Sequence, residues 1–214
     1  MDERRCSACG EPLYGWVKVD SIDGQTWVVD RCERCGLGVT RGVPDPDAVF
    51  ESVRRGLRPG QTAEMRFPNR ASLQAGIGGD RWAALELPTQ RLHPTPRSLR
   101  LLLERHGLVA PRVRQPPVGR NVVWMWQTLL NGFTFHTNFA RDVIRGRLRP
   151  KTARNVAAFA VDALVSILGA VPIALVAVPL ELGAVAARRG GELEASVAIP
   201  EASTAPLYDR SHGS

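Results

Sequence analysis

The residues with the clearest chemistry are four cysteines near the start of the sequence, arranged as two Cys-x-x-Cys pairs. Cys6 and Cys9 form the first pair, Cys32 and Cys35 form the second, and a glycine follows each pair. A Cys-x-x-Cys turn directs two thiolates toward one ion, and tetrahedral Zn²⁺ prefers such sulfur ligands. The glycines allow the positive φ that these turns often require. The spacing therefore predicts one zinc ion held by all four cysteines.

Zinc with four thiolate ligands has no open position for water, so the predicted site is structural rather than catalytic. The alternative is a redox-active pair, but redox motifs do not occur as two matched pairs around a hairpin. The chain has four cysteines in total, and their use in one site favours a reducing compartment. No apolar leader precedes the first pair. We therefore expect a cytoplasmic protein.

The segment between the cysteine pairs is expected to be a β-hairpin. Residues 14–20 and 26–31 alternate apolar and polar side chains, and residues 21–24 between them contain an Asp-Gly turn signal. Residues 1–43 therefore form the predicted zinc ribbon, and the Pro- and Asp-rich residues 44–55 form a linker with a short helix. Although the chain has a net charge of +7, the hairpin has more acidic than basic residues. Nucleic acid is therefore not favoured as a partner.

Local signals in the middle of the chain predict one strand and one helix. Residues 62–67 have the length and the flanking turn residues of a strand. Thr95, Pro96 and Gly107 supply an N-cap, a proline at the first helical position and a stop, so a helix is expected between them. Residues 69–94 are interrupted by glycine and proline and are expected to form a long loop.

An uncharged apolar run at residues 163–180 lies within a longer apolar segment, 156–187, and just reaches the length needed to cross a bilayer. Basic residues precede it, a bias that would place the N-terminal side in the cytoplasm. The alternative is a pair of helices, broken near Pro172 or Pro179, that pack on the core or lie in the membrane interface. Residues 191–214 lack periodicity and are expected to be disordered.

Five sets of residues resemble the sequence motifs of one protein family and occur in the same order as in that family. They are residues 31–40 with 44–46, residues 57–60 with 64–69, residues 72–74 with Arg81 and Trp82, residues 92–107, and residues 126–131. In this order they resemble a family of bacterial class I S-adenosylmethionine (SAM) dependent methyltransferases that begin with a zinc ribbon. The resemblance implies a Rossmann-like fold, of which residues 56–120 would be the part that follows the cofactor site.

The cofactor-binding half of that family has no counterpart in this sequence. Such enzymes carry an acidic residue and a Gly-rich turn after a strand, whereas the linker here leads directly to the later strand. The glycine cluster at residues 76–80 belongs by position to a later loop, and no apolar strand precedes it. We therefore expect no cofactor-binding residues in this chain, and no SAM binding without a partner.

The resemblance places His93 near the substrate, where an imidazole acts as a general base because its pKa lies near neutrality. The family's preceding histidine is replaced by Gln90. A base has nothing to activate when no methyl donor is bound. The alternative for His93 is therefore a structural residue of a loop beside a helix start.

The expected fold class is α+β, with the zinc ribbon followed by a truncated Rossmann-like methyltransferase remnant and, over residues 121–190, an apolar helical region. The expected function is that of a degenerate, methyltransferase-like zinc protein without enzymatic activity of its own. Two alternatives stay open. One is a zinc-ribbon adaptor that associates with the cytoplasmic face of the membrane, and the other is a methyltransferase completed by a partner chain. Membrane lipid or a protein would bind through residues 121–190, and the sequence names no substrate.

Overall fold

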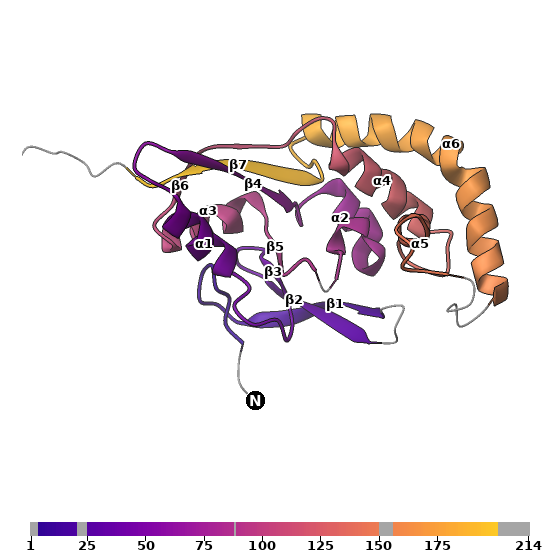
Figure 1. The fold of residues 1–214 in the computed structure, drawn as a ribbon, viewed down its shortest axis with the longest axis horizontal. Coiled ribbons are helices and arrows are strands. Elements are labelled where there is room, and N and C mark those ends of the chain that lie inside the picture. Colours follow the sequence, from indigo (N-terminus) through magenta and orange to yellow (C-terminus); the bar gives the residue numbers. More distant parts are fainter. Residues whose placement is uncertain (1–3, 21–24, 88, 150–155, 201–214) are drawn as a thin grey trace, which may run out of the picture.

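The computed structural model describes residues 4–20, 25–87, 89–149 and 156–200 of the 214-residue chain. These residues form two small β-sheets with short helices around them, and one long helix near the C-terminal end follows one side of the molecule (Figure 1). The mixed α/β architecture agrees with the α+β class expected from the sequence.

The first sheet contains the segment between the cysteine pairs. Its strands are β1 (Leu13–Asp20), β2 (Thr26–Cys32), β3 (Gly38–Thr40) and β5 (Leu92–His93), in the order β1-β2-β3-β5. The antiparallel pair of β1 and β2 confirms the predicted hairpin, and its turn at residues 21–24 lies outside the described residues. Because β3 also pairs with β5, this sheet takes its last strand from the middle of the chain.

The second sheet has three strands, β4 (Thr62–Pro68), β6 (Val109–Arg114) and β7 (Glu192–Ala198), in the order β4-β7-β6. The strand predicted at residues 62–67 is confirmed by β4. Strand β7 is antiparallel to both neighbours, so β4 and β6 run parallel to each other on either side of it. The last described strand of the chain therefore holds this sheet together.

Strand β7 corrects the prediction that residues 191–214 are disordered. Leu193 and Val197 are completely buried on one face of the strand, and the two glutamates of β7 form salt bridges with arginines of other elements. Apolar and polar residues alternate over Glu192–Ala198, which is a local strand signal, but the two pairing partners of this strand are far away in sequence. The rest of the predicted tail, from residue 201 on, lies outside the described residues.

The prediction of a long loop over residues 69–94 is also wrong. This segment contains α2 (Leu73–Gly78), two 3-10 helices (Gly79–Arg81 and Ala83–Leu85) and strand β5. Ser72 begins α2, since its hydroxyl accepts a hydrogen bond from a backbone N–H of the first turn. The glycines that suggested a loop are accommodated because each helix is only one or two turns long.

Two helices predicted from local signals are confirmed by α1 (Ala48–Gly56) and α3 (Pro96–Arg105). At the start of α3 the hydroxyl of Thr95 accepts a hydrogen bond from the backbone N–H of Ser98 at 3.1 Å, and the Ser98 hydroxyl accepts one from the N–H of Thr95 at 2.8 Å. This reciprocal capping box satisfies two backbone donors that a helix start leaves open.

The C-terminal half contains α4 (Arg120–Asn131), α5 (Phe139–Ile144) and α6 (Val156–Ala186). Helix α6 is continuous, so the alternative of two helices broken near Pro172 or Pro179 is wrong. A proline inside a helix removes one backbone hydrogen bond and bends the helix. In Figure 1, α6 curves around the side of the molecule that α4 and α5 occupy.

The hydrophobic core joins the cysteine-rich segment to the rest of the chain. One cluster of buried side chains includes Leu37 beside the second cysteine pair, Phe50 of α1, Leu99 of α3 and Leu193 of β7. Each of these four side chains is completely buried. The cysteine-rich segment therefore shares its core with α1, α3 and the second sheet.

Candidate functional site

The four cysteines come together as the sequence predicts. Their Sγ atoms all lie within 4.8 Å of one another; those of Cys6 and Cys35 are 3.5 Å apart, and those of Cys9 and Cys32 are 3.4 Å apart. In a tetrahedral site with Zn–S bonds of about 2.3 Å, the sulfurs would be about 3.8 Å apart. The cluster therefore has nearly the dimensions that a tetrathiolate zinc site requires.

Two turns of the same kind position the cysteines. In each pair the residue after the second cysteine, Gly10 or Gly36, donates its backbone N–H to the carbonyl of the first cysteine, at 2.8 and 2.9 Å. Both glycines have a φ near +80°, at 79° and 78°, a conformation that glycine adopts without strain. The role predicted for these glycines is confirmed.

The buried thiols of the cluster would need a cation in order to ionise. Burial raises the pKa of the Cys6 thiol to about 11, and burial raises that of Cys35 further. Burial would raise the pKa of Cys32 as well, but hydrogen bonds led by the backbone N–H of Cys35 lower it. Buried thiolates are stable only when a positive charge compensates them, and a bound Zn²⁺ supplies that charge.

Helix α3 holds both cysteine turns from outside the cluster. At its start the hydroxyl of Thr95 donates a hydrogen bond to the carbonyl of Cys35 at 2.8 Å, and at its end Arg105 donates one to the carbonyl of Ser7 at 2.7 Å. Thr95 is also the N-cap of α3, so one side chain serves the helix and the cysteine turn together. The metal centre and α3 therefore depend on each other.

Arg70 places a positive charge beside the second cysteine turn. Its Nε donates a hydrogen bond to the carbonyl of Gly36, and its guanidinium lies 5.1 Å from the ring centre of Trp16. Burial lowers the pKa of Arg70, while the nearby thiol groups of Cys35 and Cys32 act in the opposite direction. This guanidinium would offset part of the negative charge of a tetrathiolate zinc centre.

His93 lies in β5 rather than in a loop, and its side chain is completely buried. Its Nε2 is 3.4 Å from the hydroxyl of Thr40, its Nδ1 has no hydrogen-bond partner among the described residues, and Trp82 packs beside the ring. Burial, with a smaller contribution from Arg70, lowers the pKa of His93 to about 3. The imidazole is therefore neutral at physiological pH, and its role as a general base stays a prediction.

The burial of His93 predicts a measurable pH dependence of stability. Its pKa is about 3 in the folded chain and 6.5 when exposed, so protons bind preferentially to the unfolded chain as the pH falls below 6.5. Between pH 6.5 and pH 5 this lowers the free energy of unfolding by about 1.5 kcal/mol. In His93→Leu this contribution is absent, so we expect its free energy of unfolding to fall less between the two pH values than that of the wild-type protein. Urea denaturation at both pH values measures the difference. An identical pH dependence in both proteins would contradict the prediction.

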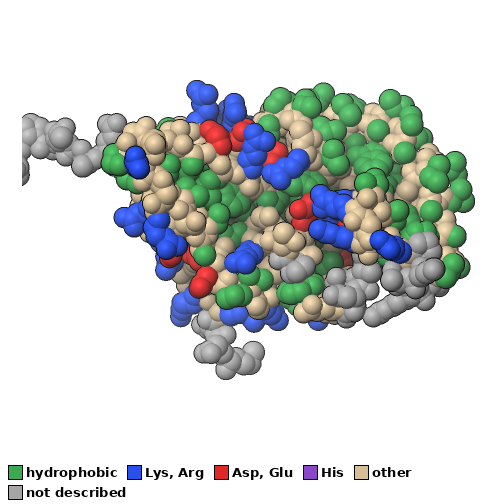
Figure 2. Space-filling model, in the orientation of Figure 1, with side chains coloured by type: hydrophobic (Ala, Val, Ile, Leu, Met, Phe, Trp, Pro, Cys, Tyr) green, Lys and Arg blue, Asp and Glu red, His purple; other side chains and the backbone are tan. Residues whose placement is uncertain are grey.

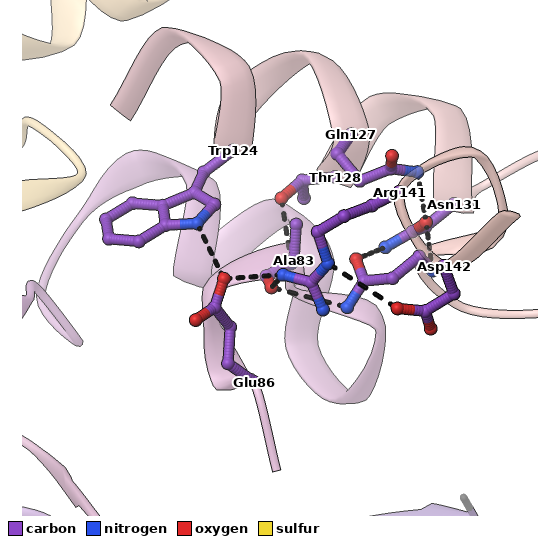
Figure 3. Close-up of polar contacts among 9 residues, drawn as sticks. Ala83, Glu86, Trp124, Gln127, Thr128, Asn131, Arg141 and Asp142 are labelled. Atoms are coloured by element: carbon purple, nitrogen blue, oxygen red, sulfur yellow. Dashed lines mark hydrogen bonds and ion pairs between the residues drawn. The ribbon is translucent and has the colours of Figure 1, made fainter. Parts of the chain in front are cut away.

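The sequence stretches after residue 69 form polar contacts that hold the fold (Figure 3). Within the 126–131 stretch, Asn131 accepts hydrogen bonds from Gln127 and from the backbone N–H of Asn138, and it donates one to the carbonyl of Arg81. Thr128 accepts a hydrogen bond from a backbone N–H of the second 3-10 helix. These contacts tie α4 to the segments before and after it.

Figure 3 also shows an ion pair that joins this region to α5. Arg141 lies 2.5 Å from a carboxylate oxygen of Glu86, which also accepts a hydrogen bond from the indole N–H of Trp124 at 3.3 Å. Burial raises the pKa of the neighbouring Asp142, although the adjacent arginines lower it. Each of these groups binds another part of the fold, so the arrangement is that of a structural network.

Helix α6 carries two carboxylates, Asp162 and Glu181, at the ends of its uncharged run, and both are completely buried. Asp162 accepts hydrogen bonds from the backbone N–H groups of Phe135 and His136, at 2.6 and 2.9 Å, and its Oδ2 lies 2.6 Å from Nδ1 of His136. Near the other end of the helix, Glu181 also accepts several hydrogen bonds. These two residues attach α6 to the rest of the protein.

Glu181 accepts hydrogen bonds from three donors on different segments. The amide of Gln74 donates at 2.8 Å, that of Asn121 at 3.0 Å, and the backbone N–H of Gly191 at 2.7 Å. The amide oxygen of Gln74 in turn accepts a hydrogen bond from Trp82. A signal for this site was present in the sequence, since a carboxylate inside an apolar helix requires partners.

The opposite face of α6 is apolar and exposed. Six of its large exposed side chains recur every three or four residues and are Leu164, Leu168, Val171, Leu175, Val178 and Leu182. Among the described residues, α6 is the one helix that is long and apolar enough to cross a membrane, and only 6% of its most apolar window is buried. Figure 2 shows hydrophobic side chains along the edge of the molecule that α6 occupies in Figure 1. We call the row formed by Leu164, Leu168, Val171, Leu175, Val178 and Leu182 the outer face of α6.

Comparisons of the chain with protein-family models, with curated proteins and with solved structures find no match. The described residues form a mixed α/β protein whose four-cysteine centre has nearly the dimensions of a zinc site. One of its helices, α6, is apolar and exposed.

Proposed function

We propose that this chain is a zinc-stabilised protein that binds the surface of a membrane through α6 and has no methyl-transfer activity of its own. The observation that carries the proposal is the distribution of side chains around α6, whose carboxylates face the protein while its outer face is apolar and exposed. Exposed apolar surface of this extent is a mark of a membrane or protein interaction site. Zinc in the four-cysteine centre would have a purely structural role.

The attachments of α6 favour a helix that lies in the membrane interface over one that spans the bilayer. A spanning helix would place β7, which follows it, on the other side of the membrane from β4 and β6. Strand β7 is hydrogen bonded to both of these strands. Glu181 is hydrogen bonded to α2 and α4, which precede α6 in the chain, and to Gly191, which follows it. Spanning would break all of these contacts, whereas interfacial binding keeps them.

We also propose that the fold derives from that of the methyltransferases that the sequence resembles. A Rossmann-like sheet that had lost its earlier strands would end at a strand with one open edge. Strand β4 stands at such an edge of the second sheet, next to β7, and the Gly-rich cofactor turn is absent from the sequence.

Isothermal titration of SAM into the zinc-loaded protein is expected to give no heat of binding. Binding by the chain alone would contradict the non-enzymatic part of the proposal.

Two substitutions on the outer face of α6 test the membrane part. We expect Leu168→Glu with Leu175→Glu to abolish flotation of the protein with phospholipid vesicles, because both side chains are exposed and each leucine contributes about 2 kcal/mol of apolar transfer. The measurement is vesicle flotation on a density gradient, with circular dichroism to show that the variant is folded.

The matched control is Tyr14→Glu, which puts a charge at an exposed aromatic residue of β1, in a sheet remote from α6 (Figure 1). This variant should float as the wild-type protein does. A wild-type protein that stays out of the vesicle fraction, or that covers the outer face of α6 by forming oligomers, would overturn the membrane proposal.

A further inference from the structure

The surface beside the N-terminal end of α6 is rich in basic residues. The sequence from residue 141 to residue 155 has six basic residues, Arg141, Arg145, Arg147, Arg149, Lys151 and Arg154, against one acidic residue, Asp142. Asp142 is buried, and Arg141 is paired with Glu86. Arg145 and Arg147, which follow α5, are exposed. The described part of this segment therefore presents positive charge to solvent.

Large apolar side chains are exposed next to these arginines. Ile144, at the end of α5, is 84% exposed, and Phe133 and Phe135, between α4 and α5, are 68% and 66% exposed. The backbone N–H of Phe135 donates to Asp162 of α6 at 2.6 Å, so this turn is fixed to the helix itself. Exposed apolar side chains are therefore held close to the N-terminal part of α6.

We propose that this basic and aromatic rim, formed by Phe133, Phe135, Ile144, Arg145 and Arg147, binds the headgroups of anionic phospholipids. The inference rests on the proposed membrane function and specifies the lipid class. Arginine side chains beside an apolar surface place their charge at the level of lipid phosphates while their stems remain in apolar contact. Phenylalanine side chains insert at the boundary between headgroups and acyl chains.

The charge pattern favours an anionic lipid surface over a protein as the occupant. Exposed apolar and basic side chains follow one another from Phe133 to Arg147, before the start of α6, and such a mixture is expected where acyl chains and headgroups meet one side of a molecule. Figure 2 shows groups of Lys and Arg side chains next to the hydrophobic side chains of this part of the molecule. Each basic residue near an anionic bilayer increases binding about fivefold at physiological ionic strength.

The test compares the double variant Arg145→Gln with Arg147→Gln to the wild-type protein on two kinds of vesicle. On vesicles that contain phosphatidylglycerol, the double variant is expected to bind about 25-fold more weakly, and the difference should shrink at high salt. On pure phosphatidylcholine vesicles the two proteins should bind alike. The control is Arg97→Gln with Arg100→Gln, which removes the same charge from exposed positions of α3.

The outcomes separate this inference from the membrane proposal on which it rests. Equal binding of the wild-type protein to both kinds of vesicle would overturn the anionic preference and leave the membrane function standing. Equal weakening by the control pair would show that net charge, rather than this rim, is responsible, and would also overturn the inference. Absence of binding to either vesicle would overturn both proposals.

Discussion

Cys35→Ser is expected to remove zinc from the protein and to abolish cooperative folding of the chain. A structural tetrathiolate zinc site contributes about 10 kcal/mol or more to folding, which is comparable with the entire stability of a domain. The effect should extend beyond the ribbon because α3 is bonded to both cysteine turns through Thr95 and Arg105. The measurements are zinc content per chain and thermal unfolding followed by circular dichroism.

Ser7 offers a matched control for this substitution. It lies between the first two cysteines, and its hydroxyl is buried without a hydrogen-bond partner among the described residues. Ser7→Ala should therefore keep the metal and the melting temperature. Removal of zinc from the wild-type protein by a chelator should reproduce the effect of Cys35→Ser. If the serine variant keeps a full equivalent of zinc and melts as the wild-type protein does, the proposed metal centre is wrong.

The second large effect is expected at the buried carboxylate of α6. Glu181→Ala would remove the acceptor of three N–H groups: one of the Gln74 amide, one of the Asn121 amide and the backbone N–H of Gly191. The second N–H of each amide keeps its bond to a backbone carbonyl. Each unsatisfied buried donor costs about 1 kcal/mol or more, so we expect the free energy of unfolding to fall by about 3 kcal/mol or more. Urea denaturation monitored by fluorescence measures this change.

Leu182→Ala is the natural comparison, because this neighbouring side chain belongs to the exposed outer face. It should change the free energy of unfolding in water by less than about 0.5 kcal/mol, as expected for a surface substitution. A Glu181→Ala variant as stable as Leu182→Ala would show that the hydrogen bonds to Glu181 do not hold α6 in place. The proposal of an interfacial rather than a spanning helix would then rest on the pairing of β7 with β4 and β6 alone.

The parts of the fold that could be predicted from sequence are those with local causes. The cysteine turns follow from the pair spacing and its glycines, and α3 follows from Thr95 and Pro96 at its start and Gly107 beyond its end. The information for these elements lies within a few residues of each one.

The parts that could not be predicted depend on partners far away in sequence. Strand β7 contains three small residues among its seven, and it is a strand because β4 and β6 bond to its two edges. The outer face of α6 has no periodic signal because the helix is apolar on all sides apart from Asp162 and Glu181. The partners of these two carboxylates and the buried side chains of Ala177 and Ala184 show which side faces the protein.

The central place of β7 has a consequence for how the chain folds during synthesis. Strands β4 and β6 pair with β7 rather than with each other, so neither can complete its sheet until the last described strand has left the ribosome. The apolar helix α6 precedes β7 and therefore emerges while its attachment site is incomplete. Pairing over such long sequence separations is slow. The nascent chain therefore passes through a period in which Glu181 of α6 lacks the backbone N–H of Gly191 and the second sheet is incomplete, and membrane or chaperone contact during that period would protect the apolar helix from aggregation.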